Sequence, residues 1–105
     1  MKTGPDIEAQ VTLISTEEGG RSGYAVSGYR PQHVFREDWV TSGAHQYITK
    51  DKLYPGESAL ANISFLSPLV QSLEIGTNLK IQEASRVVGF AKVTKIFNAQ
   101  LGRHS

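Results

Sequence analysis

Three arginines beside turn-forming residues are the side chains of this 105-residue sequence best placed for binding chemistry. Arg21 follows two glycines, Arg30 precedes a proline, and Arg86 follows a serine. A guanidinium held at a strand end can bind a phosphate or a carboxylate through two parallel hydrogen bonds, as a lysine cannot. The alternative is an internal ion pair or bonds to loop carbonyls. We favour this alternative for Arg30, and both interpretations stay open for Arg21 and Arg86.

Catalytic and metal-binding patterns are missing from the sequence. His33, His45 and His104 are scattered, and none has a histidine or carboxylate at helical spacing on an expected helix. The adjacent carboxylates of Glu17-Glu18 and Glu37-Asp38 would point to opposite faces of an extended chain, so neither pair can flank one substrate atom. No phosphate-binding loop follows the glycine pair. We therefore expect no enzyme activity, no catalytic residue, and no metal, cofactor or nucleotide site.

Composition fits one small globular domain. Apolar residues make up 39% of the chain and charged residues 20%, and the net charge of +1 is far from that of a dedicated nucleic-acid binder. The chain has no cysteine, no signal peptide and no apolar run long enough to span a membrane. These features predict a cytoplasmic monomer with a single domain over residues 1–105, a core at about 7–97, and flexible ends at 1–6 and 98–105.

Strand periodicity dominates the chain. Apolar residues alternate with polar ones from Ile7 to Leu13. They alternate again after Ser58, where Ala59, Ala61, Ile63 and Phe65 form the expected inward face and Leu60 and Leu66 are expected under loops. A short helical turn is expected from Ser67 to Leu73, with Pro68 at its first position. The strands expected from this pattern cover residues 7–15, 32–40, 44–50, 58–66, 77–83 and 85–97.

Six strands with short connections predict an all-β, six-stranded antiparallel closed barrel. Gly89 and Ala91 are unusually small for an apolar strand. Either the narrow barrel leaves no room for larger residues, or Gly89 marks a bulge. Both interpretations are compatible with a barrel.

Several motifs occur in order between residues 7 and 97. Together they resemble the third domain of bacterial elongation factor Tu, and this resemblance implies the same six-stranded barrel. Two segments match with substitutions: Asp38 to Gly43 stands for an Asp-Val-Thr-Gly turn, and Tyr54 to Ser58 resembles Met-Pro-Gly-Asp-Asn. The other motifs are Glu18-Gly19-Gly20-Arg21, the octet Gly28-Tyr29-Arg30-Pro31-Gln32-His33-Val34-Phe35, Ser67-Pro68, and Glu83-Ala84-Ser85-Arg86-Val87-Val88-Gly89.

The resemblance also implies a binding face. In the family, the positions matching Arg21, Glu83 and Ala84 lie along the face that meets the T stem of aminoacyl-tRNA. This chain departs from the family there: Ala84-Ser85 replaces a glycine pair, and Ser22 to Ala25 replaces a His-Thr-Pro-Phe-like loop. The RNA- or partner-binding residues expected from the resemblance are Arg21, Ser22, Gln32, Glu83, Ala84 and Arg86.

Three functions follow from these expectations. The first is a non-catalytic module that binds a protein partner of the translation machinery, or competes with elongation factor Tu for it. The second is a weak tRNA-binding module that uses the T-stem face. The third is the C-terminal domain of a larger GTP-binding elongation factor, although the opening Met1 and the residues after 97 favour a separate small gene.

Overall fold

The computed structural model describes residues 4–103, and the regular secondary structure within them is almost entirely β-strand. This confirms the all-β class. The parts of the expected flexible ends at residues 1–3 and 104–105 lie outside the described residues. The strands are β1 (Ile7–Leu13), β2 (Ala25–Val26), β3 (Gln32–Arg36), β4 (Trp39–Tyr47), β5 (Lys52–Leu53), β6 (Ser58–Phe65), β7 (Asn78–Glu83) and β8 (Arg86–Ile96), and the 3-10 turns are η1 (Thr16–Glu18) and η2 (Ala99–Leu101).

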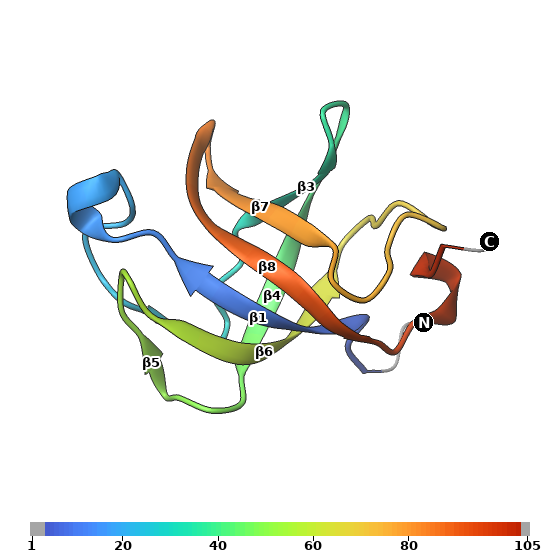
Figure 1. Cartoon of the computed structure of the whole chain (residues 1–105), viewed down its shortest axis with the longest axis horizontal. Coiled ribbons are helices and arrows are strands. Elements are labelled where there is room, and N and C mark those ends of the chain that lie inside the picture. Colours follow the sequence, from blue (N-terminus) through green and yellow to red (C-terminus); the bar gives the residue numbers. More distant parts are fainter. Residues whose placement is uncertain (1–3, 104–105) are drawn as a thin grey trace.

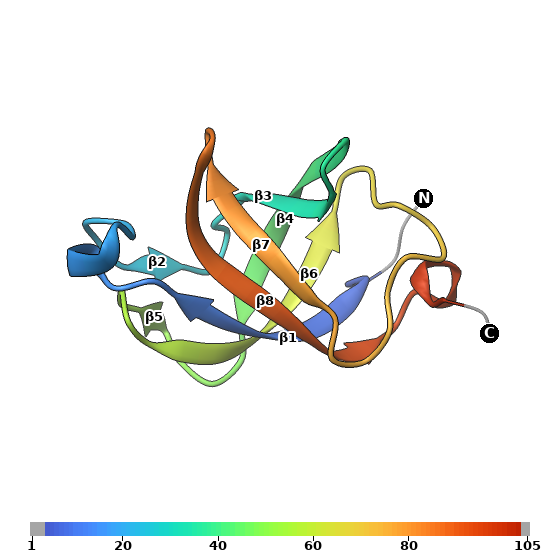
Figure 2. The same ribbon diagram turned by 45° about the horizontal axis from the view of Figure 1, so that its top comes forward.

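Six of the strands close into an antiparallel barrel in the order β1-β6-β4-β3-β7-β8 (Figure 1). Closure is completed by β8, which pairs with both β7 and β1. The remaining strands, β2 and β5, pair with each other as a small two-stranded sheet at one end of the barrel (Figure 2). The predicted six-stranded barrel is thus confirmed.

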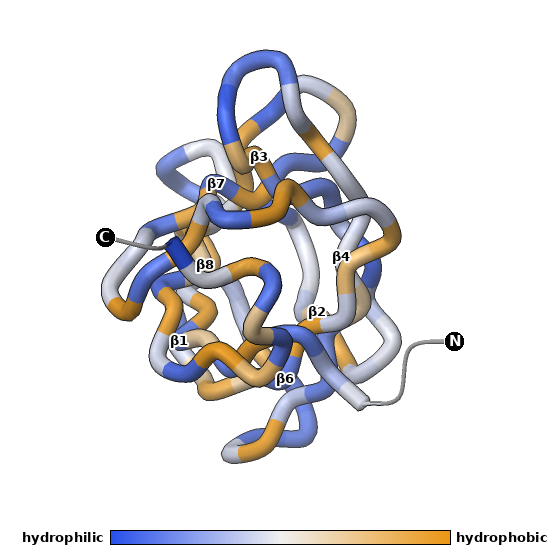
Figure 3. The backbone as a smooth tube through the Cα atoms, turned by 90° about the vertical axis from the view of Figure 1, so that its right-hand side faces the viewer, coloured by the Kyte–Doolittle hydropathy of each residue, from blue (hydrophilic) through white to orange (hydrophobic). Residues whose placement is uncertain are grey.

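The core is made by the inward residues of alternating strands. Along β6, the predicted inward residues Ala59, Ala61, Ile63 and Phe65 are all buried, as the two-residue period requires. Apolar and polar segments alternate along the tube in Figure 3 for the same reason. The expectation that Leu66 lies under a loop is wrong, because its side chain is 82% exposed.

The second and third expected strands meet at a different turn. The strand expected at 32–40 ends at Arg36, and β4 runs from Trp39 through most of the strand expected at 44–50. Arg36 spans the turn between them, and its Nε donates to the Asp38 carboxylate at 2.7 Å. Gly43 therefore lies inside the barrel and not in a turn. A Cβ there would come within 2.8 Å of the His33 ring, so only glycine leaves room for that histidine.

The helical turn expected at residues 67–73 is absent from the described chain. The backbone amides of Ser72 and Leu73 donate to the carbonyl of Leu101, and that of Gln71 donates to Gln100. Because these donors bond to the distant η2 segment, they cannot form local helical bonds.

The structure confirms the bulge at Gly89, and the room inside the barrel stays an untested explanation for the small residues on β8. A register shift opposite Ile81 and Gln82 places an extra β8 residue, Val88, next to Gly89. A Cβ on Gly89 would also lie only 2.5 Å from the carbonyl oxygen of Thr12 on β1. Gly89 therefore lies at a bulge, and the close approach of the β1 backbone is what excludes a side chain there.

The packed core extends beyond the expected limits of residues 7 and 97. Asp6 and Leu101 are both fully buried. The amides of Phe97 and Asn98 donate to the Asp6 carbonyl at 2.9 and 3.0 Å, which fastens the last strand to the segment before β1. Residues 6 and 98–102 are thus part of the folded domain.

Candidate binding face around Arg21

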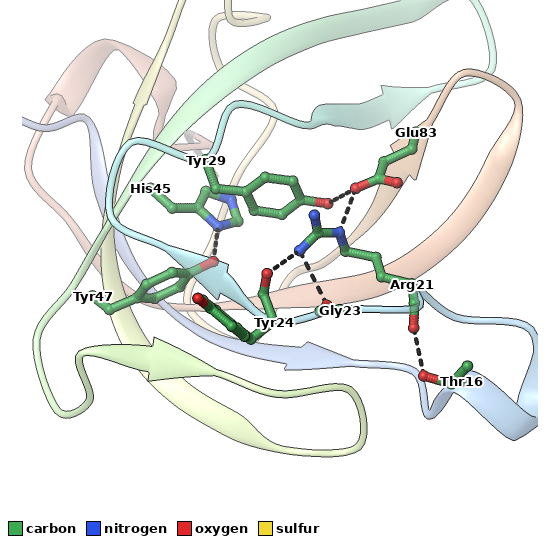
Figure 4. Close-up of polar contacts among 8 residues, drawn as sticks. All are labelled: Thr16, Arg21, Gly23, Tyr24, Tyr29, His45, Tyr47 and Glu83. Carbon is green, nitrogen blue, oxygen red and sulfur yellow. Dashed lines mark hydrogen bonds and ion pairs between the residues drawn. The ribbon is translucent and has the colours of Figure 1, made fainter.

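Two of the six expected site residues meet directly. Arg21 lies in the loop after η1 and Glu83 at the end of β7, and the Arg21 Nε is 2.7 Å from the Glu83 carboxylate (Figure 4). The pair is half-buried, with side-chain exposures of 23% and 35%. The barrel thus brings together two parts of the chain that are far apart in sequence.

Arg21 is held by several groups besides this carboxylate. Its Nη1 donates to the carbonyls of Tyr24 at 2.9 Å and Gly23 at 3.3 Å. The guanidinium carbon also lies 4.6 Å from the centre of the Tyr29 ring, in cation-π geometry. Arg21 therefore makes the internal ion pair and the carbonyl bonds that were the alternative to a binding role, although part of its side chain stays exposed to solvent.

Tyr29 completes this cluster. Its hydroxyl donates to the Glu83 carboxylate at 2.5 Å (Figure 4). Burial, reinforced by the hydrogen bond to Glu83 and its negative charge, raises the pKa of Tyr29 far above its ordinary value. The hydroxyl therefore stays protonated and serves as a fixed donor. Tyr29 was not among the expected site residues, although it lies in the octet that carried the resemblance.

The glycine pair shapes the loop that carries Arg21. Gly19 has φ of 98°, a left-handed conformation that glycine adopts without strain. A Cβ on Gly20 would overlap the carbonyl of Ile14. The Thr16 hydroxyl then donates to the Arg21 carbonyl at 2.6 Å. The glycines of the Glu-Gly-Gly-Arg motif at residues 18–21 are therefore required by the backbone path that brings the Arg21 side chain to Glu83 on β7.

The other expected residues are exposed and stay outside this bonded cluster, as far as the described residues show. Arg86 opens β8, and Ser22 follows Arg21 in the loop. Gln32 opens β3 and pairs with Gln82 on β7. The internal role favoured for Arg30 is wrong. Its side chain is exposed, and it forms no ion pair or hydrogen bond with any of residues 4–103.

Ala84 lies in the tight β7-β8 turn with φ of 55°, a left-handed conformation that strains any residue with a Cβ. We expect Ala84→Gly to raise the free energy of unfolding by about 0.5 to 1 kcal/mol in urea titration, because it relieves this strain. Ser85→Gly is the control, since Ser85 has no positive φ. A gain of the same size in Ser85→Gly would contradict the explanation.

Behind the Arg21 cluster, two buried histidines face each other inside the barrel. The Nε2 atoms of His33 and His45 are 2.8 Å apart, so one ring donates and the other accepts. His45 Nδ1 lies 3.1 Å from the Tyr47 hydroxyl, and the Tyr29 ring packs edge-on against His45 with 5.5 Å between centres (Figure 4). The sequence did contain a signal for their burial, because each histidine lies two residues from a buried residue of the same strand or its lead-in segment. We did not read this signal, because histidine is polar and is not counted in an apolar pattern.

The cluster of Arg21, Glu83 and Tyr29 is suited to binding and not to catalysis. Its arginine, carboxylate and phenol are bonded to one another, and no activated nucleophile lies among them. Within residues 4–103, no three histidine, aspartate or glutamate side chains gather where they could hold a metal. No helix of that part of the chain is both long and apolar enough to cross a membrane.

Comparison with known families identifies the domain. Residues 1–97 match the family described as Elongation factor Tu C-terminal domain. The family's domain has no catalytic role, and it places the chain among translation-factor domains. The closed six-stranded barrel agrees with this match. The chain therefore belongs to the elongation factor Tu C-terminal domain family.

Proposed function

We propose that this domain is a non-catalytic interaction module that binds a protein of the translation machinery, or competes with elongation factor Tu for one. The proposed binding surface consists of Arg21, Ser22, Gln32, Glu83, Ala84 and Arg86, and we call it the Arg21 face. We further propose that the domain acts as a cytoplasmic monomer.

The ion pair between Arg21 and Glu83 is the observation that supports a protein partner. Two of the three guanidinium nitrogens of Arg21 already donate to protein oxygens, and the Glu83 carboxylate lies 2.7 Å away. A phosphate approaching Arg21 would meet this negative charge at close range. A protein surface can instead bond to exposed loop groups around the pair and supply a carboxylate to Arg86.

A second candidate function is weak RNA binding. It is favoured by Arg86, which is exposed and unpaired among the described residues, and by the match to a translation-factor family. Few arginines are available, so affinity would be low and would fall steeply with salt. The third candidate, a domain of a larger GTP-binding factor, predicts a GTP-binding domain upstream in the same coding sequence.

The test is affinity purification of the tagged chain from nuclease-treated cytosolic extract. We expect a stable protein complex, and we expect Arg21→Gln with Arg86→Gln to reduce its yield at least fivefold. The control variant carries Arg36→Gln with Arg103→Gln, because these arginines are exposed and form ion pairs elsewhere, with Asp38 and Glu74. Thermal unfolding of both variants checks that they fold.

Two results would contradict a protein partner. One is recovery of no protein after nuclease treatment, and the other is an equal loss in the control variant. A gel shift with aminoacyl-tRNA at low salt distinguishes the second candidate. Binding there that disappears with Arg86→Gln would support RNA in place of protein.

A further inference from the structure

Two adjoining hollows on the outer face of β4 and β6 form a continuous groove. One has a volume of about 400 Å³ and the other about 270 Å³, and they share Ala44 and Ser64 as lining residues. β4 and β6 lie side by side in the barrel wall in Figure 2. We call this surface the β4-β6 groove, and its other main lining residues are Gly4, Pro5, Gln46 and Asn62 at one end and Arg30, Ser42 and Leu66 at the other.

Small outward side chains create the groove. Ala44 on β4 pairs directly with Ser64 on β6, so the middle of the groove has short side chains on both strands. Leu66, 82% exposed, borders one end, and the segment of Gly4 and Pro5 borders the other. The two hollows therefore lie between Leu66 and the Gly4-Pro5 segment.

Arg30 supplies the charge of the groove. The amides of Gly43 and His45 donate to the carbonyls of Pro31 and Tyr29 at 3.0 and 2.9 Å, which places Arg30 beside Ala44. Arg30 is exposed and has no partner among residues 4–103. Neither hollow is lined by an aspartate, a glutamate or a lysine. The groove therefore complements one negative charge.

Asn62 supplies an unused hydrogen-bond acceptor. Its Oδ1 atom is buried and has no hydrogen-bond partner among the described residues. Asn62 pairs in register with Gln46 on β4 and Glu8 on β1, so it belongs to the outward row of β6. A buried acceptor without a donor carries a desolvation cost, and an incoming N–H group would remove this cost once the Asn62 side chain turns its Oδ1 toward the groove.

We propose that the β4-β6 groove binds an extended segment of a partner protein, with an acidic side chain at Arg30 and an N–H donor at Asn62. Arg30 and Asn62 are separated by two strand-to-strand spacings across the sheet and by two residues along the strands, which together amount to about 12 Å. Three or four residues of an extended peptide span this distance. An apolar side chain after the acidic residue packs on Leu66. A nucleic-acid backbone fits less well, because it needs several cations and the groove has one. This site is independent of the Arg21 face.

The probe is the capped peptide Ac-Ser-Asn-Ala-Ala-Glu-Leu-NH₂, whose single carboxylate is the glutamate side chain. It is titrated to millimolar concentration into the ¹⁵N-labelled chain and followed by amide chemical shifts. We expect saturable shifts at Ala44, Gln46, Ser64 and Leu66. Replacing the peptide's glutamate by glutamine, or Arg30→Gln in the protein, should each weaken binding at least fivefold, whereas Arg36→Gln should leave it unchanged.

Asn62→Ala separates binding from folding. We expect this variant to weaken peptide binding at least threefold without lowering the midpoint of thermal unfolding, because the acceptor that it removes has no partner within the described fold. The proposal is overturned if the peptide shifts no groove amide, if the glutamine peptide binds equally well, or if oligouridylate shifts the same amides more strongly. Arg21→Gln should leave peptide binding intact, so this test is separate from that of the Arg21 face.

Discussion

Replacing Asp6 with alanine is expected to lower the free energy of unfolding by about 3 kcal/mol, the largest effect of any single substitution considered. For a domain of this size, such a loss lowers Tm by about 12 °C or more. The measurement is urea and thermal unfolding followed by circular dichroism.

The reason is the network around a fully buried carboxylate. Asp6 Oδ2 accepts the amide of Phe65 at 2.7 Å, and Oδ1 accepts the side-chain amide of Asn98 at 2.9 Å. Alanine would leave the Phe65 amide at the end of β6 buried without this acceptor. Hydrogen bonds to a charged acceptor are also about twice as strong as neutral ones.

Asp38→Ala is the matched control. Asp38 is exposed, and its ion pair with Arg36 bridges a surface turn. Exposed pairs contribute little to stability, so the midpoint should stay within experimental error. An Asp6→Ala variant as stable as the wild type would show that β1, β6 and the C-terminal segment do not depend on this carboxylate.

Lowering the pH from 7.5 to 5 is expected to destabilise the fold by about 2 kcal/mol for His33 alone, with an additional loss from His45. Burial lowers the pKa of His33 to about 4, and the nearby carbonyls of Pro31 and Thr41 only partly oppose this effect. Burial, followed by the His33 charge, lowers the pKa of His45 well below its ordinary value.

Stability falls at low pH because the unfolded state then binds more protons than the folded state. The unfolded histidines take up protons near their ordinary pKa of 6.5, whereas the folded His33 stays neutral down to about pH 4. Between these values the unfolded state binds more protons, so stability is complete above pH 6.5 and falls as the pH decreases. Asp38 and Glu57 have lowered pKa values, so these carboxyls lose their contribution in a more acidic range.

The measurement is urea unfolding at pH 7.5, 6.5, 5.5 and 5.0, repeated in 1 M NaCl. The salt arm is the control, because it screens surface charges and leaves the burial of His33 and His45 largely unaffected. Stability that is constant over this range, or a loss that disappears in salt, would contradict neutral buried histidines.

Much of the barrel could be predicted from local sequence. The two-residue period of β1 and β6 identified their inward faces, because successive side chains on a strand point to opposite sides. The turn between β3 and β4 could not be placed, because Ser42-Gly43 has the composition of a turn. Gly43 is instead required by the His33 ring, which approaches from a neighbouring strand.

The candidate site was predicted only in part. The motifs led us to expect Arg21 and Glu83 among the binding residues, and this role stays a prediction. They did not indicate the ion pair between these two residues or the hydrogen bond from Tyr29 to Glu83. Asp6 looked like part of a polar terminus, and nothing local indicated that its carboxylate accepts the amide of Phe65. Such contacts depend on register between strands, which the spacing within one strand does not encode.

The sequence alone determined a barrel of six alternating strands, and its ordered motifs determined the family. The barrel follows from the two-residue period of the side chains, and the family follows from short motifs in a fixed order. Both can be read from residues that are close together in the sequence. Only the tertiary structure decided that Arg21 is neutralised by Glu83, that Arg30 is exposed beside Ala44, and that His33 meets His45. Closure of the barrel sets which strands meet and in which register, and these distant pairings decide which charges are paired.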